Sequence, residues 1–470
     1  MNHTPDSIHE STLLSERIHI IGVGGSATRG LACLLRQKGI VVSGSDRDPE
    51  AREVLENHGV LFFQGHDQKN LAKDVTTVIH TRAVDSSNPE LVEAKRRSKI
   101  NIYTYSEYLG KLSSEYSTIA ISGTHGKTST TACLLSVFLA AGRDPSLIAG
   151  GEFVQIGSGW RSGNGGEFLV EACEFERAFL DLKPQAAIVT NIDLDHPEVY
   201  DDLDSVTDTF RQFVDGFPAG SWVICPPHVK AQLKTDSQLN WRTFGRGDEA
   251  DVRLIENPAI ADPEQSFWQL AGGKEISAKL QVPGAHTREN ATAVVALADA
   301  LGIEPEAIVE GLESFPGVSR RFESCDVLPE IEWIEDYAHH PEEVRATIAT
   351  AREVYPERRC HVLFQPHQAT RLEAFHEEFA KELVAADQVI LVPIYSVREN
   401  LADFPDDLLD RLVLRISELG GDCCAIGFEE AIAKIPEVVE PGEVVISLGA
   451  GNVNEIGKRI GQLIRDQVSQ

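Results

Sequence analysis

The sequence predicts an α/β protein of three domains, each built on a mostly parallel sheet. Short apolar runs recur along the chain, and most are followed by a turn and an amphipathic helix. This alternation is typical of helices layered over parallel strands. A chain of 470 residues needs more than one domain, because single cores stop growing at roughly 250 to 300 residues. We expect the domains to cover residues 1–112, 113–323 and 324–470.

The first predicted domain opens with a strand, a glycine-rich turn and a helix, in RIHIIGVGGSATRGLACLLRQ, which ends at about Gln37. Gly22, Gly24 and Ala27 match the pattern G-x-G-x-x-[GA], and Asp46 lies 22 residues after Gly24. This is the fingerprint of a dinucleotide-binding βαβ unit, in which glycines let backbone amides approach a diphosphate. The pattern favours a nucleotide ligand over a tight turn without one, and does not specify the nucleotide.

The second predicted domain opens with TIAISGTHGKTSTTACLL, residues 118–135. The usual phosphate-binding loop reads G-x-x-x-x-G-K-[ST], and Ile121 stands where its first glycine would be. Gly126, Lys127 and Thr128 nevertheless follow a predicted strand directly and begin a predicted helix. A lysine there adds a positive charge to the backbone N–H groups at the start of the helix, which together suit a phosphate, and a threonine hydroxyl can ligate Mg²⁺. We interpret the stretch as a nucleotide site with a shorter loop, the alternative being a lysine over a solvated first turn.

Two further strands of this domain are predicted to end in side chains that suit a metal. Glu171 and Glu174 close EFLVEACE, and Asp195 with His196 closes QAAIVTNIDLDH. Because the carboxyl ends of parallel strands share one edge, we expect these residues to meet Lys127 in one crevice. A single histidine at a strand end is usually structural, but its coincidence with the other groups favours a ligand role.

The third predicted domain begins near Ser324. Its strands are expected in IEWIEDYAHH, CHVLFQPH, QVILVPIY and EVVISLGAG, and an amphipathic helix in NVNEIGKRIGQLIRDQ closes the chain. Within the second domain, GSGWRSGNGG, residues 157–166, is expected to be an exposed loop.

Composition excludes several classes of function. The net charge of -30 opposes general attraction to nucleic acid or to an anionic membrane. We find no signal peptide and no apolar run long enough to span a membrane, so a cytoplasmic protein is expected. The eight cysteines contain no C-x-x-C pair and are expected to be buried thiols rather than metal ligands.

Seven motifs together resemble the Mur ligases of peptidoglycan synthesis. They are, in order, GTHGKTSTT, EACE, NIDLDH, HTRENATAV, FPGVSRRFE, EDYAHHPEE and FQPHQATR. The resemblance spans essentially the whole chain and is strongest to the member that adds the first amino acid. It implies an N-terminal Rossmann-like UDP-binding domain, a central P-loop-type ATPase domain and a C-terminal Rossmann-like domain that binds the amino acid. It also implies ATP and Mg²⁺ as cofactors, UDP-N-acetylmuramate and L-alanine as substrates, and a monomer or homodimer.

The resemblance places the site residues in four groups. The ATP-binding residues would be Gly123, Thr124, His125, Gly126, Lys127, Thr128, Ser129, Asn290, Arg321 and Asp336. The metal ligands would be Thr128, Glu171 and His196. The substrate-binding residues would be Gly22, Gly24, Gly25, Ser26, Asp46 and His66 for the sugar nucleotide, and Tyr337, His367 and Arg371 for the amino acid. The catalytic residues would be Lys127, His196, Arg321, Asp336 and His340.

The implied chemistry suits these residue types. A carboxylate and an amine do not condense in neutral water, so the lactyl carboxylate would first take the γ-phosphoryl group of ATP. Positioning and charge neutralisation dominate such a transfer, and Lys127 and Arg321 with Mg²⁺ would supply them. The amine would then attack the acyl phosphate. Whether His339 or His340 accepts its proton, or only supports the site, stays open.

Some residues depart from the family pattern. Gln368 stands where the family usually has arginine, so glycine and serine remain candidates beside alanine. Arg29 is a possible additional contact to the diphosphate, or a charge on a helix surface. Cys173 replaces a common aspartate. No lysine occurs between His196 and Lys230, as expected of a first-step ligase.

Three alternatives remain open. A related ligase could add a recycled tripeptide, although FQPH and SRRFE match it less well. An NAD(P)-dependent oxidoreductase would explain the first glycine turn but leaves GTHGKT without a role. An ATP-driven binding or regulatory protein that has lost ligase chemistry would not be expected to keep all the implied catalytic groups.

Overall fold

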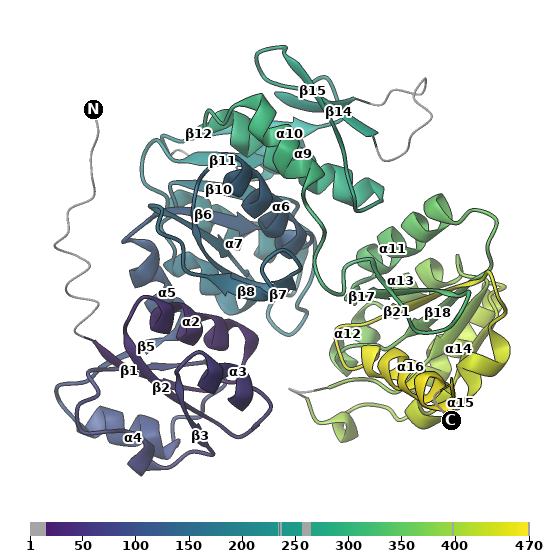
Figure 1. The fold of residues 1–470 in the computed structure, drawn as a ribbon, viewed down its shortest axis with the longest axis horizontal. Helices are drawn as coiled ribbons and strands as arrows, with labels where there is room; N and C mark the ends of the chain where they lie inside the picture. The colour runs from purple at the N-terminus through teal and green to yellow at the C-terminus, as the bar shows by residue number, and fades with distance from the viewer. Residues whose placement is uncertain (1–15, 234, 236, 256–264, 397–398, 469–470) are drawn as a thin grey trace.

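The computed structural model describes residues 16–233, 235, 237–255, 265–396 and 399–468. The chain forms three lobes, each around its own sheet, with the N-terminal and C-terminal lobes both beside the central one (Figure 1). An α/β architecture of three largely parallel sheets is therefore confirmed. The predicted residue ranges of the three domains stay predictions.

The first lobe contains a five-stranded parallel sheet in the order β3-β2-β1-β4-β5. Its strands are β1 (Arg17–Ile21), β2 (Val41–Asp46), β3 (Leu61–Gln64), β4 (Thr77–His80) and β5 (Asn101–Thr104). Its helices are α2 (Ser26–Gln37), α3 (Arg52–Asn57), α4 (Pro89–Arg96), α5 (Tyr105–Ser113) and the 3₁₀ helix η1 (Gln68–Asn70). The helix predicted to end at about Gln37 ends at that residue.

The central lobe contains a ten-stranded sheet in the order β15-β14-β13-β12-β11-β10-β6-β9-β7-β8. Its strands are β6 (Ser117–Ser122), β7 (Ser146–Phe153), β8 (Ser158–Arg161), β9 (Glu167–Glu171), β10 (Ala186–Val189), β11 (Trp222–Cys225), β12 (Asn240–Gly245), β13 (Val252–Ile255), β14 (Gln265–Gln269) and β15 (Glu275–Lys279). Its helices are α6 (Lys127–Ala140), α7 (Leu203–Asp215), α8 (Pro227–Leu233), α9 (Ala285–Ala300), α10 (Pro305–Glu313) and the 3₁₀ helix η2 (Phe175–Asp181). In spatial order, the strands β7-β9-β6-β10-β11-β12-β13 pair in parallel. Strand β8 at one end of the sheet, and β14 and β15 at the other end, pair in antiparallel fashion.

The expectation of an exposed loop over residues 157–166 is wrong. Ser158–Arg161 forms β8, which pairs with β7 in antiparallel fashion at the sheet edge. Gly163 packs so closely that a Cβ there would lie 2.1 Å from the Asp144 carbonyl oxygen. The glycines of this run therefore serve close backbone packing as well as turning.

The third lobe contains a six-stranded sheet in the order β16-β17-β21-β18-β19-β20, parallel except for β16. Its strands are β16 (Glu323–Cys325), β17 (Glu332–Asp336), β18 (Cys360–Phe364), β19 (Gln388–Leu391), β20 (Cys423–Ala425) and β21 (Val444–Leu448). Its helices are α11 (Pro341–Val354), α12 (Ala369–Ala374), α13 (His376–Leu383), α14 (Leu408–Glu418), α15 (Phe428–Val438), α16 (Asn454–Val468) and the 3₁₀ helix η3 (Leu401–Asp403). The four strand motifs predicted for this domain correspond to β17, β18, β19 and β21.

One continuous core joins the first lobe to the central lobe. Tyr108 and Leu112 of α5 belong to the same buried cluster as Phe179 and Phe213. Gly110 allows the approach, because a Cβ there would lie 2.5 Å from the Asp181 carbonyl oxygen. The edge of the first sheet is thus held against the central lobe by packing. No helix in the described part of the chain is long and apolar enough to cross a membrane.

Candidate active site

The nucleotide loop lies between β6 and α6, as its spacing predicts. Gly126 is the N-cap of α6 and has φ 81°, a conformation that glycine adopts without steric cost. A Cβ at Gly126 would lie 2.5 Å from Asn290 Oδ1, so the loop packs directly on α9. The loop geometry therefore brings Asn290, over 150 residues away in sequence, to the start of α6.

Lys127 is folded over this loop. Its Nζ donates to the carbonyl oxygens of Gly123 (2.6 Å) and Thr124 (2.9 Å) and lies 3.1 Å from Glu174 Oε2. Burial opposes the charged ammonium, but the Glu174 carboxylate outweighs burial, and the pKa of Lys127 is raised. The lysine is therefore a charged group held at the carboxyl edge of the central sheet.

Two of the predicted metal ligands, Thr128 and Glu171, lie beside this lysine, and the third, His196, follows β10 at the same edge of the sheet. Thr128 hydrogen-bonds the Glu171 carboxylate, which also accepts the Gly150 backbone N–H. Burial raises the pKa of Glu171, and its Oε1 has no hydrogen-bond partner within the described residues. His196 has φ 56°, and its ring nitrogens lie 3.7 Å from Asp195 and 3.5 Å from Glu198 carboxylate oxygens. A buried carboxylate oxygen without a hydrogen-bond partner, beside a hydroxyl, is a donor set that fits a divalent cation.

A buried ion pair joins the central and C-terminal lobes. The Arg371 guanidinium donates to Asp195 Oδ1 from Nε (3.1 Å) and from Nη2 (2.8 Å), and its Nη1 lies 3.2 Å from His367 Nδ1. The two charged side chains are 6% and 8% exposed. Burial alone would raise the pKa of Asp195, but the charges of His196 and Arg371 prevail and hold it well below its usual range. Two of the residues predicted to face the amino acid thus lie against the strand end that carries His196.

A cluster of histidines surrounds Glu343 at the same lobe boundary. His125 Nδ1 and His339 Nδ1 each lie 3.3 Å from a Glu343 carboxylate oxygen, and Arg321 Nη1 lies 3.9 Å from it. Burial would raise the pKa of Glu343, but the histidines lower it well below the usual value. Burial also lowers the pKa of His339 to about 4. Glu343 is therefore an anion at the centre of the predicted phosphate region.

His340 has both ring nitrogens engaged by the backbone. Its Nε2 lies 3.2 Å from the Leu194 carbonyl oxygen, and its Nδ1 accepts the Glu342 N–H at 3.4 Å. These partners place the ring proton on Nε2. The arrangement caps α11 and ties it to the central lobe, which favours a supporting role over proton transfer for His340.

Asp336 shapes the connection between the same lobes. Its carboxylate accepts the backbone N–H of Phe322 (2.9 Å) and of Ala338 (2.8 Å), and burial raises its pKa. Arg320 and Phe322 both have positive φ, so this carboxylate holds a strained turn. The turn directs Arg321 into the cleft, where its guanidinium lies 5.2 Å from the centre of the Tyr337 ring.

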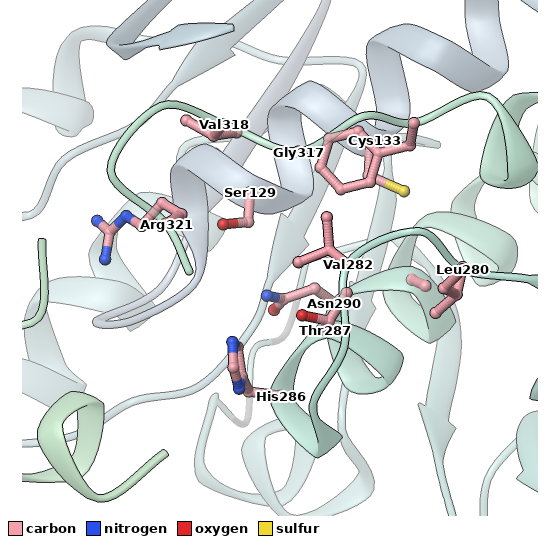
Figure 2. A pocket seen from close by; sticks show the side chains of 12 residues that line it. Ser129, Cys133, Leu280, Val282, His286, Thr287, Asn290, Gly317, Val318 and Arg321 are labelled. Carbon is pink, nitrogen blue, oxygen red and sulfur yellow. The ribbon is translucent and has the colours of Figure 1, made fainter. Parts of the chain in front are cut away.

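Arg321 also borders a pocket between α6, α9 and the connecting segment. Figure 2 shows Ser129, Asn290 and His286 between Arg321 on one side and Val282 and Leu280 on the other. The wall formed by Val282, Leu280 and Cys133 is apolar, whereas Asn290 and Ser129 are polar. This pocket encloses only about 20 Å³, but Ser129, Asn290 and Arg321 also line a larger cavity of about 280 Å³, which has room for a planar base.

The predicted sugar-nucleotide residues gather at one edge of the first sheet. Gly22, Gly24, Gly25 and Ser26 form the turn before α2, and Asp46 Oδ2 accepts the Gly24 N–H at 2.8 Å. His66 Nδ1 lies 3.0 Å from Ser45 Oγ at the neighbouring strand end. Ser26 Oγ donates to the Gly150 carbonyl oxygen at 2.9 Å. Since Gly150 also bonds Glu171, this turn is directly connected to the metal-compatible group.

Glu343 and His286 were missed by the sequence reasoning. Glu343 stands in the quoted EDYAHHPEE motif, but an acidic residue in a first helical turn is common and carries no separate signal. His286 faces the pocket from the first turn of α9, and burial lowers its pKa to about 4. Glu343 meets His125 only through the packing of two lobes, whereas His286 faces its pocket from within the central lobe.

Three family models cover most of the chain. Residues 17–117 match the Mur ligase family catalytic domain, 161–298 the Mur ligase middle domain, and 320–451 the Mur ligase glutamate ligase domain. The chain is similar to UDP-N-acetylmuramate--L-alanine ligases of Clostridium acetobutylicum (34% identity, 95% of this chain and 97% of the relative) and Acetivibrio thermocellus (36%, 94% and 95%).

Solved structures agree with this assignment. The UDP-N-acetylmuramate-alanine ligase of Thermotoga maritima superposes with a TM-score of 0.78 at 28% identity, over 97% of this chain and all of that one. A murein peptide ligase of Psychrobacter arcticus shares the fold, with a TM-score of 0.70 at 22% identity over 95% and 98% of the two chains. With the three-lobed fold and the shared cleft described above, these similarities show that the chain belongs to the Mur ligase family.

Proposed function

We propose that the protein is an ATP-dependent ligase that joins L-alanine to the lactyl carboxylate of UDP-N-acetylmuramate. One observation carries the proposal: a single cleft holds the nucleotide loop, the metal-compatible groups and the residues expected to face the amino acid. The relatives named for this reaction match more than nine-tenths of both chains. We further propose that the reaction takes place in the cytoplasm, by a monomer or homodimer.

Two Mg²⁺ ions fit the residues of the central lobe. Thr128 and Glu171 would hold one ion, because Glu171 Oε1 is a buried oxygen without a hydrogen-bond partner among the described residues. His196 would hold the other ion. Bound Mg²⁺ would neutralise phosphate charge during transfer. Cys173, at the position where the family often has aspartate, leaves Glu171 and Glu174 in place.

The loop residues would position ATP for phosphoryl transfer. Lys127 exchanges its carbonyl partners for phosphate oxygens, since carbonyl oxygens are weaker partners for an ammonium than a polyphosphate. Arg321 approaches from the connecting turn held by Asp336 and stabilises charge on the transferred group. The base would lie against Asn290 in the larger cavity that Gly126 and Arg321 also line. The lactyl carboxylate then takes the γ-phosphoryl group, and ADP leaves.

The C-terminal lobe would bring the amine to the acyl phosphate. Arg371 and His367 face the end of the strand that carries Asp195 and His196, so a bound amino acid lies next to the activated carboxyl group. Attack by the amine forms the amide and releases phosphate. The fixed ion pairs across the boundary exclude water from the acyl phosphate, which would otherwise hydrolyse.

Gln368 bears on the choice of amino acid. Its side chain is buried and accepts the Ser396 hydroxyl at 3.0 Å, and its backbone has φ 67°. It therefore offers a neutral amide beside Arg371, which leaves Arg371 as the predicted cation for the substrate carboxylate. A small neutral side chain such as that of alanine, glycine or serine is compatible with this environment.

The proposal is tested by phosphate release from ATP and Mg²⁺ with UDP-N-acetylmuramate and alanine, glycine or serine in turn, followed by mass analysis of the product. We expect release that requires both the sugar nucleotide and alanine, with formation of the amide. Release with a tripeptide in place of alanine would instead identify the recycling ligase. No amide with any amino acid, despite ATP binding, would refute the proposed reaction.

A further inference from the structure

A second group of potential metal ligands lies outside the cleft, on the outer strand of the third sheet. Glu323 and Cys325 are two residues apart on β16, so their side chains share one face, and Glu335 of β17 pairs directly with Glu323. Their carboxylate oxygens and the Cys325 Sγ all lie within 4.8 Å of one another. Two strands thus place two carboxylates and a thiol around one point.

Glu335 is the least exposed of the three residues and is negatively charged when ionised. Its side chain is 6% exposed, and no hydrogen bond or ion pair engages its carboxylate within the described residues. The nearest charges are Arg320 and Lys458, which attract it, and Glu323 and Glu455, which repel it. The Arg320 guanidinium instead donates to Gly449 and Gly451, and Lys458 pairs with Glu455.

Such a carboxylate needs a positive partner. Like charges directly opposite on antiparallel strands destabilise a sheet, and the burial of most of the Glu335 side chain adds to the cost of its charge. One oxygen of Glu323 accepts the Arg320 backbone N–H at 2.7 Å, so this second carboxylate is held opposite Glu335. A cation or a shared proton at this point would offset both penalties.

The ligand types select the cation. A thiolate with two carboxylates suits Zn²⁺, which binds sulfur and oxygen in tetrahedral sites, whereas Mg²⁺ prefers oxygen alone. A tetrahedral zinc ion needs its ligand atoms roughly 3.5 Å apart. Rotation of the partly exposed Glu323 and Cys325 side chains can close the remaining distance. The sequence shows no C-x-x-C spacing for this site, because its ligands come from two paired strands.

We propose that Glu323, Cys325 and Glu335 bind a thiophilic divalent cation of the Zn²⁺ type. Binding replaces the thiol proton of Cys325 by the metal and releases that proton to solvent. The site lies directly after the turn that carries Arg320 and Arg321. A bound cation therefore fixes the first strand of the C-terminal lobe at the point where the chain enters it.

The test is a titration of the full-length, reduced protein with Cd²⁺ in saturating Mg²⁺, following the ultraviolet absorbance of the cadmium–thiolate bond. We expect one equivalent of Cd²⁺ to produce the band, and Zn²⁺ to remove it by competition. Cys325→Ser should lose the band. Glu335→Gln should weaken binding, and the exposed Cys424→Ser should behave as the unaltered protein.

Thermal melting in a chelator shows that the variants fold. Glu335→Gln is expected to melt no lower than the unaltered protein, because it removes a buried charge without a partner. Weaker Cd²⁺ binding by that variant is then a loss of ligand and not of structure. The absence of a band, or a band that survives in Cys325→Ser, would overturn the proposal. A band lost only in Cys173→Ser would overturn it too, by placing the cadmium in the cleft.

Discussion

The cleft contains two positively charged side chains that differ in whether the ion-pair partner lies in the same lobe. Lys127 is neutralised by Glu174, and both belong to the central lobe. Arg371 is neutralised by Asp195, but the arginine lies on α12 of the C-terminal lobe and the aspartate follows β10 of the central one. Both members of the first pair lie at the edge of one sheet, whereas the second pair forms only while two lobes are in contact.

This difference assigns the two pairs different roles. A pair within one lobe fixes the phosphate-binding cation before any substrate arrives, because no rigid-body motion can separate its members. A pair across lobes couples the position of the amino-acid site to the position of the metal-compatible strand end. Breaking the first should abolish catalysis, and breaking the second should loosen the contact between lobes.

The largest effect is expected for Lys127→Met. Loss of one preorganised donor to the transferred phosphoryl group should lower kcat by roughly 10²- to 10³-fold. It also leaves Glu174 buried without its ion-pair partner, at about 3 to 5 kcal/mol of unfolding free energy. Phosphate release and urea unfolding measure the two effects separately.

The double variant Lys127→Met, Glu174→Gln is the matched control for that experiment. It removes the unpaired carboxylate and should recover most of the lost unfolding free energy while activity stays low. Activity above one-tenth of normal in the single variant would contradict the role assigned to Lys127.

A smaller loss of stability is expected for Arg371→Met. Asp195 loses its guanidinium partner, but separation of the lobes can return this carboxylate to water, so the cost should fall below about 3 kcal/mol. The KM for the amino acid should rise, and small-angle X-ray scattering should show a larger radius of gyration. Arg345→Met removes an exposed i,i+3 pair, worth about 0 to 1 kcal/mol, and serves as the control. An unchanged KM and radius of gyration would contradict the coupling.

Acidification should lower the unfolding free energy through His339, whose ring lies beside Glu343 and the Tyr337 carbonyl oxygen. Its folded pKa of about 4 lies below the ordinary value of 6.5, so the folded protein keeps it neutral where the unfolded chain binds a proton. Above pH 6.5 the neutral ring costs no unfolding free energy. As the pH falls from 6.5 towards 4, the unfolded chain takes up the proton first, and the unfolding free energy declines by on the order of 3 kcal/mol. Urea unfolding should show a shallower dependence on pH in His339→Gln and no change in the exposed His228→Gln. Equal slopes in all three proteins would refute this.

Local motifs explain why much of this site was predictable. Gly126, Lys127 and Thr128 are contiguous, and a strand followed at once by a helix fixes where their backbone lies. Glu171 ends β9 and His196 follows β10, the two parallel strands on either side of β6, so the sheet edge that they share follows from the fold class alone. The fold and family predictions are confirmed, whereas the individual site roles stay predictions.

What could not be predicted depends on contacts distant in sequence. Strand β8 lies in a glycine-rich polar run, and only its pairing with β7 makes it a strand. Strands β12 to β15 extend the central sheet and were not predicted, although β13, β14 and β15 alternate buried and more exposed residues. Arg371 pairs with Asp195, and Glu343 with His125, across a lobe boundary, and no pattern within one lobe specifies how two lobes dock.

The smallest effect is expected where the first lobe touches the cleft. Ser26→Ala removes the hydrogen bond from Ser26 Oγ to the Gly150 carbonyl oxygen, an exposed contact. The packed core around Gly110 and Phe179 already holds the first lobe, so unfolding free energy should change by less than about 0.5 kcal/mol. Gly150 also bonds Glu171, so the KM for the sugar nucleotide should still rise, by about fivefold or less.

Steady-state kinetics with varied UDP-N-acetylmuramate, set against the exposed Ser86→Ala, tests this prediction. A change in KM without a change in stability would mean that the turn acts on the substrate and not on the lobe contact. A large loss of stability would instead mean that this contact resembles the Arg371–Asp195 pair, and that the first lobe too is held by polar links across a boundary.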